Sequence, residues 1–424
     1  MSSETILRSQ LNSSSMNRMV QNPRLILERQ ANRFHTNKMN VPSYVSYHEI
    51  TANNTASSGS TNVNFSLVAS SGLLRRVFVR VAWTAHTLTG GTTPTITAEP
   101  DHALQYITNG GTSRIYFTHG SKNIMEMDGH FIRNAVYESI TDSQLKSNYA
   151  NAARFDLSSS ERLSELASAG EAYIELPNFW NYYNEEDIFQ SLRVGGLNSP
   201  LEVYFEQFDA AADTYGTTGS PSAVADGYTV TLLGEYVDIP SMYKDRLTAQ
   251  VSSSDPTNAM VWQAPYIERV RRTLASGSSS YTVDLSAFKR QSDMIFVVVR
   301  DSSASSWNTN VTDIKSFSLE CDSHTVYALR GETEMPMNFN RYIEAPRILG
   351  SVSHTQDILV IKPTIEDNCD GAFSLLDMSQ FNQINLTLTF DSSISHDYSV
   401  TAFSVSRTLY AHTGGRITDE ILGI

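Results

Sequence analysis

The strongest constraint on the fold of this chain is an internal repeat of alternating hydrophobic residues. Residues 63–81 and 281–299 carry the same pattern at a separation of 218 positions. The matching apolar positions are Val63, Phe65 and Leu67 with Tyr281, Val283 and Leu285, and Val77, Val79 and Val81 with Ile295, Val297 and Val299. Because successive side chains of a strand point to opposite faces, each copy predicts two half-buried β-strands. A period of about 200 residues predicts two similar domains, since solenoid repeats span only about 20 to 50 residues.

The two halves of the chain also close alike, each with a strand, a polar loop and a long final strand. The closing strands are predicted at 201–205 and 228–237 in the first half, and at 384–390 and 398–405 in the second. Clusters of Ser, Thr, Asn and Gly between β-branched and aromatic runs favour many strands joined by turns. We therefore predict an all-β protein with an N-terminal arm over 1–44, a first barrel over 45–250 and a second over 251–424.

Short helices and loops are predicted between these strands. Helical segments are expected at 142–153, 158–169 and 184–192, and residues 240–247 predict one or two helical turns that link the barrels. The Thr- and Gly-rich stretch 84–100 predicts a loop that leaves the first barrel.

The N-terminal arm has its own helical signal. Asn22 is a suitable N-cap and Pro23 suits the first helical position, followed by a mixture of apolar residues and arginines up to Phe34. This amphipathic helix either docks on its own domain or contacts a membrane, a genome or a neighbouring subunit.

Charge separates the arm from the rest of the chain. The net charge is -14, but the first 40 residues hold six basic and two acidic residues and carry +4, which leaves -18 for the remainder. An acidic body is repelled by phosphate backbones and is not expected to coat nucleic acid. Hydrophobic residues make up 40% and charged residues 18%, a composition that favours packed cores over disorder.

Cysteine content and terminal sequence restrict the setting of the protein. Cys321 and Cys369 are too few for a disulfide framework or a zinc cluster, so both are expected to be buried thiols. The N-terminus lacks the basic start and apolar core of a secretory signal, and no run approaches the ~18 apolar residues of a membrane span. We therefore expect synthesis in a cytosolic compartment.

One group of residues could suggest an enzyme. A glycosidase needs two carboxylates and an aromatic platform on which a sugar stacks. The carboxylates could come from Glu171, Glu175, Glu185, Glu186 and Asp187, and the platform from Phe179, Trp180, Tyr182 and Tyr183. We favour instead an acidic loop beside a packed aromatic segment. No catalytic residue is therefore predicted.

Other chemical motifs are not present in the sequence. The histidines, including His119, His130, His324, His354, His396 and His412, form no HExxH or other closely spaced metal pattern. The glycine pairs at 90–91, 110–111 and 414–415 form no phosphate-binding loop, and no GxSxG motif occurs. We predict no metal and no cofactor. Arg269, Arg271 and Arg272 could form a basic patch, for which a subunit contact is favoured over a nucleic-acid site.

The order of several segments resembles a known family, the double jelly-roll major capsid proteins of tailless membrane-containing phages, virophages and nucleocytoplasmic large DNA viruses. The segments are Glu-Leu-Pro-Asn-Phe-Trp at 175–180, Gly-Leu-Asn-Ser-Pro-Leu-Glu-Val at 196–203, and those at 231–239, 265–270, 294–300 and 400–417. Together they extend over most of residues 45–420. The polar and helical insertion between about 120 and 170 departs from the family pattern, and the closing segment lacks some of its apolar residues.

The resemblance implies a fold and a function. The fold is two consecutive eight-stranded jelly rolls with short helices in the loops. The function is that of a structural, non-enzymatic subunit that forms trimeric, pseudo-hexameric capsomers of an icosahedral virion. The expected partners are other copies of the chain, minor capsid or penton proteins and, through the arm, an internal membrane or the genome, with no small-molecule substrate. The alternative is a virion spike or receptor-binding protein, for which β-barrels with long loops are equally suitable.

Overall fold

The structure of the protein is a computed structural model. It describes residues 43–68, 72–91, 95–97, 103–104, 107, 114–129, 131–137, 140, 143–155, 157, 159–180, 191–208, 216–218, 223–225, 227–255, 259–301, 314–330, 339–340, 343, 358–362 and 375–421.

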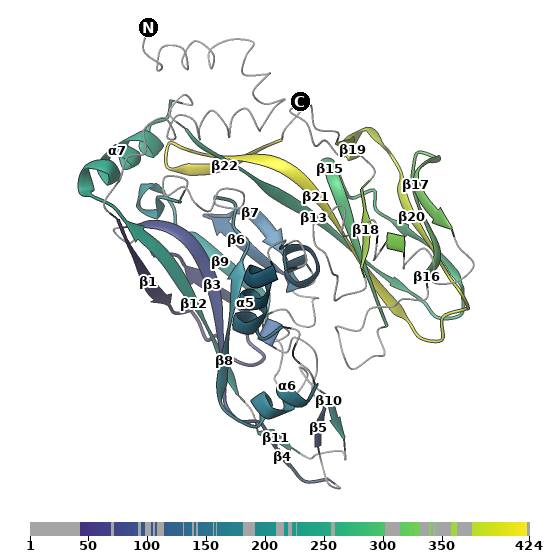
Figure 1. Ribbon diagram of the computed structural model, residues 1–424. Coiled ribbons are helices and arrows are strands. Elements are labelled where there is room, and N and C mark those ends of the chain that lie inside the picture. The colour runs from purple at the N-terminus through teal and green to yellow at the C-terminus, as the bar shows by residue number, and fades with distance from the viewer. Residues whose placement is uncertain are drawn as a thin grey trace.

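The first half of the chain forms a sandwich of two four-stranded antiparallel sheets, which we call the first barrel (Figure 1). One sheet has the order β1-β12-β3-β8 and the other the order β2-β9-β6-β7. The strands are β1 (Tyr44–Ile50), β2 (Thr61–Ser66), β3 (Leu73–Trp83), β6 (Ile115–His119), β7 (Lys122–Met127), β8 (Gly170–Leu176), β9 (Leu201–Gln207) and β12 (Tyr228–Asp238). First and last strands of the half lie side by side, as a jelly roll requires.

The second half repeats this arrangement as the second barrel. Its sheets have the orders β13-β21-β15-β18 and β14-β20-β16-β17. The strands are β13 (Met260–Leu274), β14 (Ser280–Asp284), β15 (Gln291–Asp301), β16 (Ile314–Cys321), β17 (His324–Arg330), β18 (Leu359–Ile361), β20 (Ile384–Phe390) and β21 (Tyr398–Thr413). Each strand takes the same position in its sheet as its counterpart in the first barrel.

The predicted repeat is confirmed down to single residues. β3 and β15 both begin and end 218 positions apart. Both strands also contain a β-bulge, at Arg75 and at Asp293, and these residues are again 218 positions apart. The alternating pattern therefore specified the strands and their register, because a slip of one residue would turn every core side chain to the opposite face.

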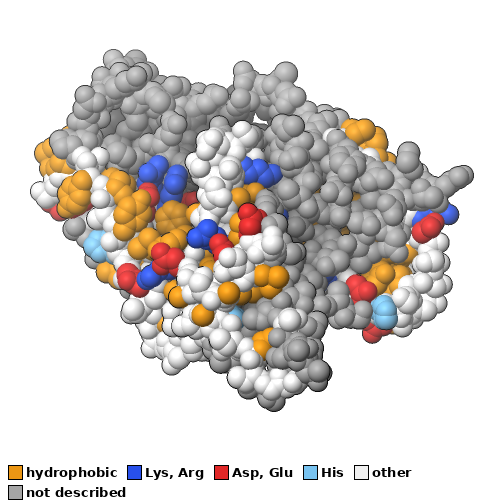
Figure 2. All heavy atoms as spheres, turned by 60° about the horizontal axis from the view of Figure 1, so that its bottom comes forward, with side chains coloured by type: hydrophobic (Ala, Val, Ile, Leu, Met, Phe, Trp, Pro, Cys, Tyr) orange, Lys and Arg blue, Asp and Glu red, His pale blue; other side chains and the backbone are white. Residues whose placement is uncertain are grey.

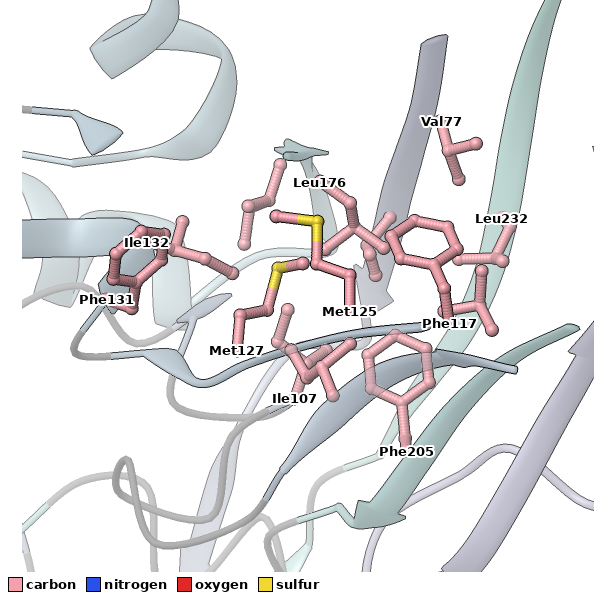
Figure 3. Close-up of a cluster of buried hydrophobic side chains, with 14 of the residues drawn as sticks. Val77, Ile107, Phe117, Met125, Met127, Phe131, Ile132, Leu176, Phe205 and Leu232 are labelled. Atoms are coloured by element: carbon pink, nitrogen blue, oxygen red, sulfur yellow. The ribbon is translucent and has the colours of Figure 1, made fainter. Parts of the chain in front are cut away.

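Each barrel buries the apolar face of both of its sheets. In the first barrel Val77 and Leu232 from one sheet meet Phe117 and Phe205 from the other, and Met125 lies beside Phe117 (Figure 3). In the second barrel a separate cluster is formed by residues such as Val297, Phe317 and Leu388. Cys321 belongs to this second cluster and is a buried free thiol, as predicted, whereas Cys369 lies outside the described residues.

Insertions distinguish the first barrel from the second. The predicted helices are confirmed as α5 (Ser143–Ala153) and α6 (Ser159–Leu166), and α5 packs on β8. The turn η1 (Phe131–Val136) precedes them, and η3 (Val194–Gly196) lies before β9. The predicted helix in the arm lies outside the described residues, as do residues 184–190 of the helix predicted at 184–192; Leu192 is not helical and forms a β-bridge with Leu74.

Two predictions about loops were incomplete. The stretch 84–100 contains short strands, and these pair with the later polar loop into two ribbons at the far end of the first barrel (Figure 1). The ribbons are β4 (Thr87–Thr89) with β11 (Ala223–Ala225) and β5 (Thr95–Thr97) with β10 (Gly216–Thr218).

The linker is the twelve-residue helix α7 (Ser241–Ser252). It is longer than predicted, because Leu247 and Val251 give it apolar contacts along its length. The remaining elements are β19 (Leu376–Asp377), η7 (Met378–Gln380) and β22 (Arg416–Ile421).

Truncating Phe117 tests the core of the first barrel. Phe117 is fully buried, and its ring lies 5.5 Å from that of Trp180. We expect Phe117→Ala to lower the free energy of unfolding by roughly 3–5 kcal/mol through the cavity it leaves. Urea denaturation followed by tryptophan fluorescence measures the change. The control Leu145→Ala, on the exposed side of α5, should change stability by less than about 0.5 kcal/mol, and an equal loss in both variants would contradict this assignment.

Candidate functional site

The acidic and aromatic residues that could suggest a glycosidase do not form such a site among the described residues. Phe179 and Trp180 are buried in the core and cannot serve as a platform for a sugar. Glu171 lies 2.9 Å from Arg80, and Glu175 lies 3.6 Å from Arg76. The hydrogen bond from Arg80 lowers the pKa of the Glu171 carboxyl, whereas a general acid needs a raised pKa.

The other members of that group lie beyond the part of the chain that the structure describes. They are Tyr182, Tyr183, Glu185, Glu186 and Asp187. The two glutamates that the structure describes, Glu171 and Glu175, form ion pairs with arginines on the outer face of a sheet.

Within the described residues, no group of three or more His, Cys, Asp and Glu could hold a metal ion. His324 and His396 are exposed, His119 and His412 are buried, and His130 and His354 lie outside the described residues. Gly414 and Gly415 form the turn between β21 and β22, with φ of +57° and +70°. Among the helices described, none is long and apolar enough to cross a bilayer.

A buried contact joins the two barrels, and we call it the inter-barrel contact. Strand β7 and the segment after it, from the first barrel, lie against β13 and β22 of the second. A single hydrophobic cluster runs across this boundary and includes Met125 and Met127 on one side, and Phe296, Val298 and Val405 on the other.

Aromatic rings complete this contact. Phe131 of the first barrel lies 6.4 Å from Phe296 and 6.0 Å from Phe403 of the second, measured between ring centroids. Phe179 lies 5.1 Å from Tyr410, whose hydroxyl donates to the Ile124 carbonyl oxygen at 3.4 Å. The aromatic segment that the sequence placed beside an acidic loop is therefore part of the joint between barrels.

One buried ion pair lies in the inter-barrel contact. Arg269 Nη1 of β13 lies 3.1 Å from Asp128 Oδ2, directly after β7, and the Asp128 side chain is fully buried. Asp128 Oδ1 also accepts a hydrogen bond from the Phe131 backbone N–H, so the carboxylate holds η1 as well as the second barrel. A charge buried without its partner is strongly destabilising, so the pair fixes which surfaces meet.

The three arginines predicted as one patch divide between two faces of β13. Arg269 and Arg271 share one face and Arg272 points to the other, because side chains alternate along a strand. Arg271 and Arg272 are exposed, whereas Arg269 is used within the chain. A subunit contact through these residues stays a prediction.

His412 is a titratable group that sequence patterns did not single out. It is fully buried on β21, close to Gly196 of the first barrel and 6.2 Å from the Trp262 ring. The pKa of His412 is lowered to about 4, mainly by burial; the Gly196 backbone opposes this shift and the nearby His119 adds to it.

Breaking the buried ion pair tests the inter-barrel contact. Asp128→Asn keeps the hydrogen bond from Phe131 but removes the charge, and we expect it to lower the free energy of unfolding by roughly 3–5 kcal/mol. Denaturation of Asp128→Asn, Arg269→Met and the double variant gives the coupling, and the double variant should lose less than the sum of the two single losses. The exposed pair Arg114–Glu206 is the control, since Arg114→Met should cost less than about 1 kcal/mol. Equal losses at both pairs would contradict the role given to Asp128.

The pKa of His412 predicts a stability loss in acid. The unfolded chain has a histidine pKa near 6.5 and takes up its proton first as the pH falls. Stability is therefore unaffected by His412 above about pH 6.5 and falls between 6.5 and 4, by on the order of 3 kcal/mol.

His412→Phe keeps a ring beside Trp262 and should flatten this dependence, measured as the free energy of unfolding against pH. His396→Phe, at an exposed position, should keep it. If the wild type and His412→Phe give parallel curves, His412 is not the group responsible.

Comparisons with known proteins give structural matches only. No family model matches the chain, and no curated protein matches its sequence. Among solved structures, a chain of the PBCV-1 virus capsid has a TM-score of 0.63 at 10% identity, covering 90% of this chain and 98% of that one. The Faustovirus major capsid protein has a TM-score of 0.61 at 7% identity, covering 90% and 91%.

The mavirus major capsid protein follows, with a TM-score of 0.51 at 9% identity, covering 89% of this chain and 90% of that one. These TM-scores and coverages show a shared fold over nearly the whole chain. The predicted resemblance is confirmed at that level: the chain has the double jelly-roll fold of viral major capsid proteins.

Proposed function

We propose that this protein is the major capsid protein of an icosahedral virus, a structural subunit whose activity is assembly. The observation that carries the proposal is the pair of jelly rolls in one chain, with the fold of the PBCV-1 and Faustovirus capsid chains over 90% of its length. Two similar barrels per chain allow three chains to present six similar barrels. A trimer of this chain can therefore act as a pseudo-hexameric tile.

The physical properties of the fold support a shell subunit. In each barrel the two inner strands of every four-stranded sheet are paired on both sides, so only the outer strands present edges that could pair with another chain. Copies can then meet through chosen side chains and edges at high local concentration. A homotrimer with closed symmetry satisfies these contacts.

The proposal extends to other partners and to location. Further partners are neighbouring capsomers, minor capsid or penton proteins and, through the basic arm, an internal membrane or the genome. The protein is made in the host cytosol and ends in the virion. The arm over 1–44, the first barrel over 45–250 and the second over 251–424 are its functional parts, a division supported by the two sets of strands on either side of α7.

The proposal assigns no catalytic role to the chain. This part of the proposal is supported by the ion pairs of Glu171 and Glu175 with arginines, and by the burial of Phe179 and Trp180 in the core.

The mass of the purified protein in solution tests the proposal. Light scattering should give a stable species of about three times the 47.1 kDa of one chain. A clean monomer at high concentration would contradict the capsomer and would favour a spike or receptor-binding protein.

Removing the arm tests its separate role. Deletion of residues 1–35 leaves every described strand in place, so trimers should form as in the full chain. Particle formation should fall, because the basic arm would no longer bind its partner on the inner side of the shell. Particle yield by electron microscopy measures the effect, and an unchanged yield would overturn the role of the arm.

A further inference from the structure

The inter-barrel contact uses one edge of the first barrel and one face of the second. The edge is β7, and the face belongs to the sheet β13-β21-β15-β18. Both barrels possess both surfaces, because their strand orders are the same. Among the described residues, the corresponding edge of the second barrel, β17, and the corresponding face of the first, which begins at β1, make no such contact within the chain.

Strand register identifies the residues that correspond to Asp128. In the first barrel Val63, Phe205, Ile115 and Met127 are neighbours across the sheet, and Asp128 follows Met127. In the second barrel the equivalent neighbours run across β14, β20, β16 and β17 as Tyr281, Leu388, Phe317 and Leu329. Val63 and Tyr281 are related by the 218-residue repeat. The counterpart of Asp128 is therefore Arg330.

The same procedure identifies the counterpart of Arg269. Neighbours across the first sheet are Ile50, Leu232 and Val79, and Glu49 precedes Ile50. Neighbours across the equivalent sheet are Val270, Ala402 and Val297, and Arg269 precedes Val270. Val79 and Val297 are again 218 positions apart. Arg269 therefore corresponds to Glu49.

The β17 edge and the β1 face therefore carry charges at the positions equivalent to the buried ion pair, with the two signs exchanged. Asp128 and Arg269 become Arg330 and Glu49, which are again a cation and an anion. Glu49 is 53% exposed and lies 3.3 Å from Arg80, and Arg330 is exposed with no ion-pair partner among the described residues. Two independent strand registers, one from each sheet, give this complementarity of charge.

The apolar side chains of β17 are less buried than those of β7, as expected if β17 has no second barrel packed on it. Ile124, Met125 and Met127 of β7 are about 1% exposed beneath the second barrel. Their counterparts in β17, by the same register, are Val326, Tyr327 and Leu329, which pack against the second core yet remain partly exposed.

The β1 surface also exposes apolar groups. Val45 and Tyr47, which share the face of Glu49 because side chains alternate along β1, are 48% and 58% exposed. Figure 2 shows hydrophobic side chains gathered with charged ones at the left of the molecule, the side on which β1 lies in Figure 1. β17 lies at the opposite side, so the two surfaces can meet only between copies.

We infer that β17 of one subunit docks on the β1 surface of the next, with Arg330 of one chain paired with Glu49 of its neighbour. The inference rests on the proposed trimer and specifies its contact. A contact between two different surfaces repeats head to tail, and three copies close it into a ring in which every barrel meets the next in the same way.

Charge reversal tests the pairing in the full-length chain. Glu49→Arg and Arg330→Glu each place like charges opposite one another in all three contacts, so each should raise the concentration at which trimers half-dissociate by at least about tenfold. The double variant restores opposite charges and should recover trimers. Glu161→Arg, at an exposed position on α6, is the control for the change in net charge. Mass photometry over a dilution series gives the trimer fraction, and thermal melting of each variant checks that the chain is folded.

The outcomes separate this inference from the function on which it rests. A wild-type trimer that both single variants weaken and the double variant restores supports the pairing. A wild-type trimer unaffected by either single variant, or weakened by both without recovery in the double variant, overturns the pairing and leaves the capsid function standing. A wild-type monomer at every concentration overturns the proposed function itself.

Discussion

The structure depends on the burial of one strand edge, β7, against a sheet of the second barrel. Without this contact the chain would be two sandwiches joined by α7. With it, one hydrophobic cluster spans both halves and Asp128 is buried with Arg269 as its partner. Hydrophobic burial supplies most of the free energy of such a contact, because it removes large apolar side chains from water. The ion pair adds selectivity, since any other docking would leave a charge buried alone.

The two barrels share a topology but differ on the outer faces of their equivalent sheets. The face that the first barrel covers is apolar, with Phe296, Val298 and Val405. By the same register their counterparts in the first barrel are Phe78, Arg80 and Glu235, and the arginine and glutamate take part in ion pairs. A contact within the chain can be permanent and dry. A contact between subunits that must find partners in solution is better served by a mixed surface, which stays soluble before assembly.

Much of the fold could be predicted because the alternation of apolar and polar residues is read within short stretches of the sequence. Alternation in 63–81 and 281–299 specified strands, faces and spacing, and helix signals located α5 and α6. The ribbons of β4 and β5 were missed because three-residue strands carry too little alternation to be recognised. The site was less predictable. Asp128 and Arg269 are 141 positions apart. The sequence singled out Arg269 only as part of a basic patch, and Asp128 has no local signal. Only register across the sheets reveals that Arg330 and Glu49 correspond to them.

The central claim is that one type of contact joins barrels both within a chain and between chains. A cryo-electron microscopy reconstruction of the purified assembly, at a resolution that shows side chains, tests it most directly. The account predicts a closed ring of three chains in which β17 lies against the β1 surface of the neighbour and Arg330 faces Glu49. A ring in which β17 faces solvent, or a dimer in which two β1 surfaces meet, would contradict it.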